Sequence, residues 1–271
     1  MSLEALPTAP QQPRPQPQPQ PESHPRARLG NALASEWTKI RSVQSTIWTL
    51  AAMFALILGI GLLADAYDDG RVNGDAYLSN GLGGFIVGQI PVVTLGVLVV
   101  TSEYGTGMIR TTLTAYPRRA SLLTAKAMVF FGLALVLGIL ATGLQLLGGM
   151  VLLSGQGTDP TGGQALLAVV GGGLYLALIG LFALAVGTLL RHSAGAIAVM
   201  LGLLLLPFIL ALFMPTGPRE ALLTYSPINM SASMYSDGTG SMGGWPLLAV
   251  LAAATAVVLA GAYAALRRRD V

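Results

Sequence analysis

The chain has 271 residues, of which 53% are hydrophobic and 10% are charged. An ordinary soluble domain carries roughly 25% charged residues, so the composition predicts an integral membrane protein. Because there is no cysteine and only two histidines occur, His24 and His192, the sequence excludes a disulfide framework, a thiolate metal site and a cysteine nucleophile, and it argues against a histidine metal centre. The net charge of +3 is small, and we expect no nucleic-acid partner.

The N-terminal segment differs in composition from the rest of the chain. Residues 1–27 are rich in proline and glutamine and contain no apolar run, which predicts a disordered tail with polyproline II character. A solvated tail and a ligand for a proline-binding domain both fit this composition. We assign residues 28–271 to a single membrane domain and expect no signal peptide.

An amphipathic helix is predicted at the start of the membrane domain. Within residues 28–45, a stripe of Leu29, Leu33, Trp37 and Ile40 recurs at helical spacing. The residues away from this stripe are Glu36, Lys39 and Arg41. We therefore expect this helix to lie in the membrane interface, with the tryptophan at the headgroup level.

Six apolar segments follow, each long enough to cross a hydrocarbon core of about 30 Å as a helix. We place them near Thr46–Ala64, Leu82–Val100, Ala127–Leu153, Ala165–Leu190, Ala194–Met214 and Trp245–Leu266. With both termini in the cytoplasm, thirteen lysines and arginines lie inside and two lie outside, as the positive-inside rule requires. Asp65 then falls in the first outside loop. The fold class is accordingly all-α, with six transmembrane helices.

A polar and basic stretch, residues 101–126, separates the second and third spans. Glu103 closes the preceding apolar run, and Gly105 and Gly107 allow the backbone to turn. Apolar residues then recur at helical spacing until Pro117, which predicts a short helix between the spans. Since a charged side chain at mid-membrane costs at least about 2.5 kcal/mol, we expect the stretch to lie outside the hydrocarbon.

Two sequence patterns here resemble a known family. The pattern S-E-x-G-x-G-x-I-R-x-T-L, followed by P-R-R and a lysine that opens the next span, is similar to the cytoplasmic coupling loop of bacterial type-2 ATP-binding cassette (ABC) exporter permeases. The string A-S-E-W-T-K-I-R-S is similar to the interface helix of the same permeases. The resemblance extends from about Leu33 to the C-terminus. It also covers LLTYSPINMSASM, which resembles the outside region that often holds short re-entrant helices before the last span.

The resemblance implies a function and a set of partners. It implies a permease subunit that forms the pathway for ATP-driven efflux of a hydrophobic or amphiphilic substrate across the bacterial plasma membrane. Partners would be a cytoplasmic ABC ATPase, a second permease copy or relative, and membrane lipid. No cofactor is expected on this chain, because ATP would be bound by the ATPase subunit.

The resemblance also implies site residues. Those of the coupling loop are Glu103, Gly105, Gly107, Arg110, Pro117, Arg118 and Arg119. Those of the interface helix are Glu36, Trp37, Lys39 and Arg41. In the family these elements dock onto the ATPase, whereas an ordinary juxtamembrane helix held by lipid headgroups would also explain the second set. Glu103 would pair with a basic group of the ATPase, fix the loop to its own bundle, or anchor at the headgroups.

Other functions remain as alternatives. No phosphate-binding G-x-x-x-x-G-K-[ST] loop and no catalytic or metal-binding set occurs, so we expect no enzymatic activity. A membrane scaffold or sensor subunit that carries nothing would have the same composition. A secondary carrier is disfavoured, because no ionisable residue falls well inside the six segments.

Polar and small residues within the spans predict helix contacts. Gln89 and Gln145 either bond to a neighbouring helix or line the pathway. Small residues recur along three spans, and we expect each set to pack against a neighbouring helix. The sets are Gly84 with Gly88; Gly173, Ala177, Gly180, Ala183 and Gly187; and Ala249, Ala253, Ala256 and Ala260.

Overall fold

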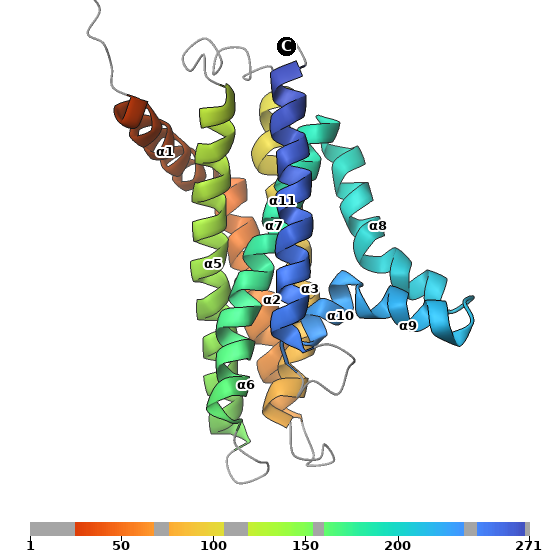
Figure 1. Cartoon of the computed structure of the whole chain (residues 1–271). Helices are drawn as coiled ribbons and strands as arrows, with labels where there is room; N and C mark the ends of the chain where they lie inside the picture. The colour runs from red at the N-terminus through yellow and green to blue at the C-terminus, as the bar shows by residue number, and fades with distance from the viewer. Residues whose placement is uncertain (1–24, 68–75, 106–118, 154–159, 236–242, 269–271) are drawn as a thin grey trace, which may run out of the picture.

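The computed structural model describes residues 25–67, 76–105, 119–153, 160–235 and 243–268. All regular structure within these residues is helical, and six helices are long and apolar enough to cross a membrane (Figure 1). The predicted all-α membrane fold with six spans is therefore confirmed. The predicted tail lies outside the described residues except at its end, because the first helix begins at Pro25 rather than at residue 28.

The helices are longer than predicted at several ends. They are α1 (Pro25–Ser42), α2 (Gln44–Ala66), α3 (Ala76–Gly105), α5 (Arg119–Leu152), α6 (Gly162–Leu166), the π-helix η1 (Leu167–Gly171), α7 (Gly172–Leu190), α8 (Ser193–Ala211), α9 (Thr216–Thr224), α10 (Pro227–Ala232) and α11 (Gly244–Arg268). Helix α6, η1 and α7 together form one span. The second and third spans extend well into the stretch 101–126 that the sequence analysis placed between them.

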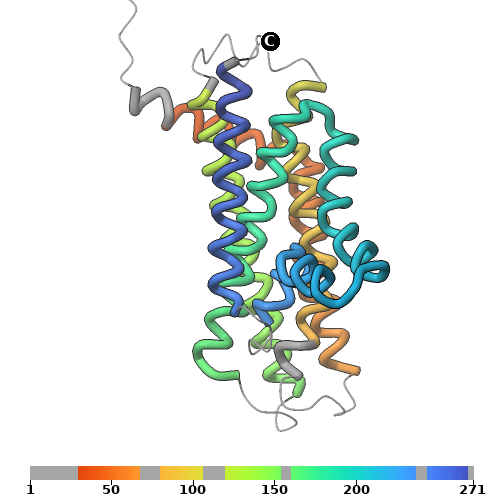
Figure 2. Tube along the Cα trace, turned by 45° about the vertical axis from the view of Figure 1, so that its right-hand side comes forward, coloured from red at the N-terminus to blue at the C-terminus, as the bar shows by residue number. Residues whose placement is uncertain are grey.

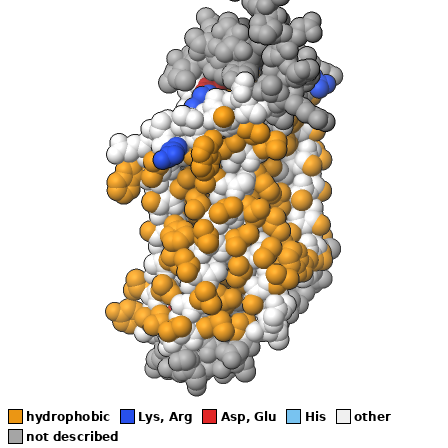
Figure 3. All heavy atoms as spheres, turned by 90° about the vertical axis from the view of Figure 1, so that its left-hand side faces the viewer, with side chains coloured by type: hydrophobic (Ala, Val, Ile, Leu, Met, Phe, Trp, Pro, Cys, Tyr) orange, Lys and Arg blue, Asp and Glu red, His pale blue; other side chains and the backbone are white. Residues whose placement is uncertain are grey.

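Successive long helices run in opposite directions through the bundle (Figure 1). Helix α1 and the C-terminal turn of α11 lie at the same end, which we call the termini end. Helix α1 runs obliquely to the long helices there (Figure 2). Between the two ends, the visible face of the bundle is mostly hydrophobic, as expected of a surface that contacts lipid (Figure 3).

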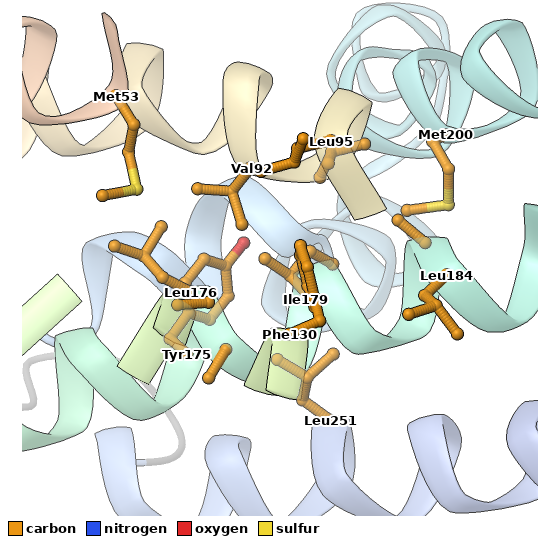
Figure 4. Close-up of a cluster of buried hydrophobic side chains, with 14 of the residues drawn as sticks. Met53, Val92, Leu95, Phe130, Tyr175, Leu176, Ile179, Leu184, Met200 and Leu251 are labelled. Atoms are coloured by element: carbon orange, nitrogen blue, oxygen red, sulfur yellow. The ribbon is translucent and has the colours of Figure 1, made fainter. Parts of the chain in front are cut away.

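Helix α7 is the centre of the bundle. It packs against α3, α5 and α11, and its small-residue stripe makes the predicted close contacts. A Cβ added at Gly180 would lie 2.7 Å from Phe130 Cε1 and 2.8 Å from Val92 Cγ1, so these side chains would have to shift to make room for it. Figure 4 shows Val92 of α3, Phe130 of α5 and Tyr175 of α7 in the same buried cluster.

The alanine stripe of α11 does not pack within the bundle. Ala249, Ala253, Ala256 and Ala260 are all exposed, so the predicted packing of this stripe inside the chain is wrong. The buried face of α11 is formed instead by Leu247, Leu248, Leu251, Thr255 and Ala262. By contrast, Gly84 and Gly88 of α3 closely approach Ile57 of α2, as predicted.

Two short helices, α9 and α10, lie before the last span, where the resemblance implied short re-entrant helices. Helix α10 contacts α3, α8 and α11 and buries Pro227, Met230 and Ser231. The Tyr175 hydroxyl lies 2.8 Å from the Pro227 carbonyl oxygen and 2.7 Å from Gln89 Oε1. Helix α10 is thus joined by hydrogen bonding to the middle of the bundle.

Candidate functional site

Four charged side chains meet in a closed set of ion pairs at the termini end. Lys126 Nζ lies 2.8 Å from Glu36 Oε2 and 2.7 Å from Glu103 Oε1. Lys39 Nζ lies 2.9 Å from Glu36 Oε1 and 2.8 Å from Glu103 Oε1. We call these four residues the charge quartet. Figure 3 shows charged side chains at this edge of the hydrophobic surface.

The quartet joins three helices because of where its residues lie. Glu36 and Lys39 are three residues apart on α1, a spacing that brings both side chains to one helix face. Glu103 lies in the last turn of α3, and Lys126 lies about two turns into α5. Since α1 packs directly against α5, the two charges of α1 are brought to those of the antiparallel pair α3 and α5.

Because three of the four side chains are buried, the stability of the quartet depends on each charge having an oppositely charged partner. The side chains of Glu36, Lys126 and Glu103 are only 4%, 4% and 7% exposed, whereas that of Lys39 is 34% exposed. Two carboxylates and two ammonium groups balance in charge, so the quartet as a whole is neutral. Removing one partner of a buried ion pair leaves an uncompensated charge and costs about 3–5 kcal/mol. Partial burial opposes the charged form of Lys39, but the hydrogen bonds and charges of Glu103 and Glu36 outweigh it and raise its pKa.

The quartet lies at the base of the predicted coupling loop. Helix α3 ends at Gly105 and α5 begins at Arg119, so the helices that carry Glu103 and Lys126 lead directly into and out of residues 106–118. Gly105 has open space where a Cβ would lie. The predicted short helix and four of its site residues, Gly107, Arg110, Pro117 and Arg118, lie outside the described residues. Arg119 is the first residue of α5.

Helix α1, the predicted interface helix, turns Glu36 toward the bundle. Glu36, predicted to lie away from the apolar stripe, is 3% exposed, while Trp37 of that stripe is 51% exposed. Arg41 is also exposed. This arrangement could not be predicted from the sequence, because Lys126, which provides the opposite charge for Glu36, lies 90 residues further along the chain. The sequence did contain one signal of an ion pair. Glu103 and Lys126 interrupt two consecutive apolar helices at the same end of the bundle.

A second contact holds α3 to the turn between α7 and α8 at the same end. The guanidinium carbon of Arg191 lies 5.2 Å from the ring centroid of Tyr104, a cation–π geometry. Arg191 has φ 55°, in the left-handed region, which ends α7 sharply. His192 then caps α8, its Nδ1 accepting from the Gly195 N–H at 3.0 Å. Helix α3 is therefore held on both sides, by the quartet and by Arg191.

The polar residues of the spans form hydrogen bonds between helices. Gln89 is 1% exposed and accepts from the Tyr175 hydroxyl, whereas Gln145 is fully buried and its Nε2 donates to Asp65 Oδ2 at 3.4 Å. Within this chain, both amides therefore form hydrogen bonds between helices. Asp65 itself was predicted in an outside loop, but it lies in the last turn of α2 and is 2% exposed. Burial next to an amide of α5 allows the helix to continue through it.

Comparison with protein-family models matches residues 32–208 to the ABC-2 family of transporter proteins. The chain belongs to the ABC-2 transporter family. The match begins within α1 and ends within α8, so this ABC-2 chain has all four quartet residues inside the matched region. Comparison with curated proteins found no match.

Membership defines the general role of the chain. ABC-2 chains form the membrane component of ABC transporters, and the six apolar spans agree with this role. The chain is a multi-pass permease subunit. Membership of this family implies partnership with an ABC ATPase subunit.

Proposed function

We propose that this ABC-2 permease exports a hydrophobic or amphiphilic substrate, and that the charge quartet couples its spans to a separate ATPase. The single observation that carries this proposal is the position of the quartet. Residues 106–118 connect the helices of Glu103 and Lys126, and the quartet binds both helices to α1. A force applied to residues 106–118 therefore acts on α1, α3 and α5 together.

Glu103 has a central position in this mechanism. Its Oε1 accepts from both Lys39 and Lys126, whereas its Oε2 is buried and has no hydrogen-bond partner among the described residues. Of the three roles left open for Glu103, these contacts favour fixing the loop to its own bundle. In the proposed mechanism, the ATPase docks on residues 106–118 and on the exposed side of α1, including Trp37 and Arg41.

The proposed orientation places the termini end in the cytoplasm, where the ATPase and ATP are. This follows from the positive-inside rule, because Lys39, Arg41, Lys126 and Arg191 all belong to that end. The membrane is proposed to be the bacterial plasma membrane. The complex would contain two ATPase subunits and two permease subunits, with ATP bound only by the ATPase and no cofactor held by this chain.

The proposal is tested by purification of the tagged chain from native membranes in mild detergent, followed by mass spectrometry. In one variant, residues 106–118 are replaced by a glycine–serine linker of equal length. In a matched control, residues 236–242, between α10 and α11, are replaced in the same way. We expect an ABC ATPase to co-purify with the intact chain and the control but not with the first variant.

Size-exclusion chromatography shows whether each variant remains folded, so loss of the ATPase can be separated from loss of the bundle. Absence of an ATPase from every folded sample would contradict the proposal and favour a scaffold. An ATPase that remains bound to the linker variant would show that docking occurs elsewhere.

A further inference from the structure

A groove of about 370 Å³ opens beside the charge quartet, between α1, α2 and α3. Its volume is near the lower end of the range for small-molecule sites. The four quartet residues line one end of the groove, and apolar side chains of α1 and α3 line another part of its wall. These include Ile40, Leu95 and Leu98.

The wall of the groove changes from apolar to polar toward the termini end. Leu95 is buried in the bundle, and Ser102 is exposed about 10 Å further along α3. Ser45, at the start of α2, is also exposed at the polar end of the groove. A ligand that fits this wall has an apolar part beside Leu95 and Leu98 and a polar part beside the end of α1.

One positive charge is accessible at the polar end. Glu36, Glu103 and Lys126 also line the groove, but their side chains are at most 7% exposed and are paired with each other. Lys39 is 34% exposed, and its ammonium donates to one oxygen of Glu36 and one of Glu103. An ammonium has three N–H donors, so one remains for a ligand.

We propose that this groove binds an anionic phospholipid of the adjoining leaflet, with its phosphate at Lys39 and one acyl chain along Leu95 and Leu98. The positive charge of Lys39 favours an anionic phospholipid over one whose headgroup carries a cationic end. The phosphate accepts from Lys39, and a headgroup without a cationic end avoids repulsion from Lys39. The groove holds this lipid as a resident ligand that packs α1 against α2 and α3. The proposed lipid is not the transported cargo.

Native mass spectrometry of the purified full-length chain tests the proposal. The chain is first incorporated into nanodiscs of equal parts phosphatidylglycerol and phosphatidylcholine, and the lipid retained after transfer to detergent is counted. We expect phosphatidylglycerol to be retained at least about fivefold over phosphatidylcholine, the selectivity that one accessible basic side chain provides. Equal retention of the two lipids would overturn the proposal.

Two matched pairs of variants locate the site. Lys39→Gln removes the accessible charge from the groove, whereas Arg41→Gln removes the same charge from α1 outside its lining. Leu98→Trp fills the apolar wall, whereas Leu203→Trp changes a leucine of α8 that is 39% exposed. We expect the first member of each pair to lose the retained phosphatidylglycerol and the second to keep it.

Leu98→Trp and Leu203→Trp test the groove even if Lys39→Gln fails to fold, because Leu98 is not part of the quartet. Retention that is the same in Leu98→Trp and Leu203→Trp would show that the lipid binds elsewhere. No ATPase is present in this experiment, so its outcome is separate from that of the co-purification.

Discussion

Lys126 and Glu36 are 90 residues apart in the chain, and their side chains form a 2.8 Å ion pair in which each is only 4% exposed. This pair binds α1, which is not a membrane span, to α5, which is one. Through Glu103, the same ammonium also holds the end of α3. The three elements next to residues 106–118 are thereby joined by one set of buried charges.

Removal of the Lys126 charge should destabilise the bundle strongly. Lys126→Met leaves two buried carboxylates with only Lys39 as a partner, and breaking a buried pair costs about 3–5 kcal/mol. We expect a clear decrease in unfolding midpoint in mixed micelles. Arg41→Gln, at an exposed position of α1, is the control and should change the midpoint little. Equal midpoints for the two variants would contradict the account of the quartet.

The double variant Glu36→Leu with Lys126→Met should recover much of the stability lost in Lys126→Met. It removes one acid and one base together, and Lys39 remains paired with Glu103 at 2.8 Å. Replacing a buried ion pair by apolar side chains is often neutral, because no unpaired charge remains. A double variant whose loss equals the sum of the single losses would show that the two charges do not interact.

Tyr175 should hold α10 in place. Tyr175→Phe removes the hydroxyl that lies between Gln89 and the Pro227 carbonyl and leaves buried polar groups unpaired, at a cost of about 1–3 kcal/mol. We expect faster hydrogen exchange of the amides of α10 and unchanged exchange in α1. Tyr67→Phe, at a position 82% exposed, is the control. Unchanged exchange in α10 would show that this bond does not fix the helix.

The contact between α5 and α7 should not accept a methyl group. In Gly173→Ala, the new Cβ would lie 2.5 Å from Ile139 Cγ1 and 2.9 Å from the Ile139 backbone nitrogen, so the helices must separate. We expect a lower unfolding midpoint. Gly202→Ala in α8, where no atom lies within 4 Å of the new Cβ, should leave the midpoint unchanged or raise it, because alanine favours helix over glycine by about 1 kcal/mol. The reverse order would contradict the packing of α7.

The orientation can be measured directly because the chain contains no cysteine. Ser42→Cys and Gly217→Cys place single thiols at exposed positions, the first at the end of α1 and the second in α9. With the termini end in the cytoplasm, a membrane-impermeant maleimide should label Gly217→Cys in intact cells and Ser42→Cys only after permeabilisation. The opposite pattern would invert the proposed topology.

The spans could be predicted from sequence because runs of about 20 apolar residues have few alternatives to a membrane helix. The ends of the spans could not be predicted, because a charged residue was taken to mark the end of each membrane helix. Glu103 and Lys126 lie within helices because buried ion pairs compensate their charges, and Asp65 lies within α2 next to the buried amide of Gln145. These partners come from distant parts of the sequence. The small residues of α7 and α11 show the same limit. Both stripes have helical spacing, but only the three-dimensional arrangement shows which one faces a neighbouring helix.

The most direct test of the central claim is to follow α9, a helix outside the charge quartet, while the ATPase turns over. Gly217→Cys in α9 is labelled with an environment-sensitive fluorophore before assembly with the ATPase in nanodiscs, and its emission is recorded on addition of ATP. We predict an ATP-dependent change in the otherwise unchanged chain. In Glu103→Gln, this change should be lost although the ATPase remains bound. An undiminished change in Glu103→Gln would contradict coupling through the charge quartet.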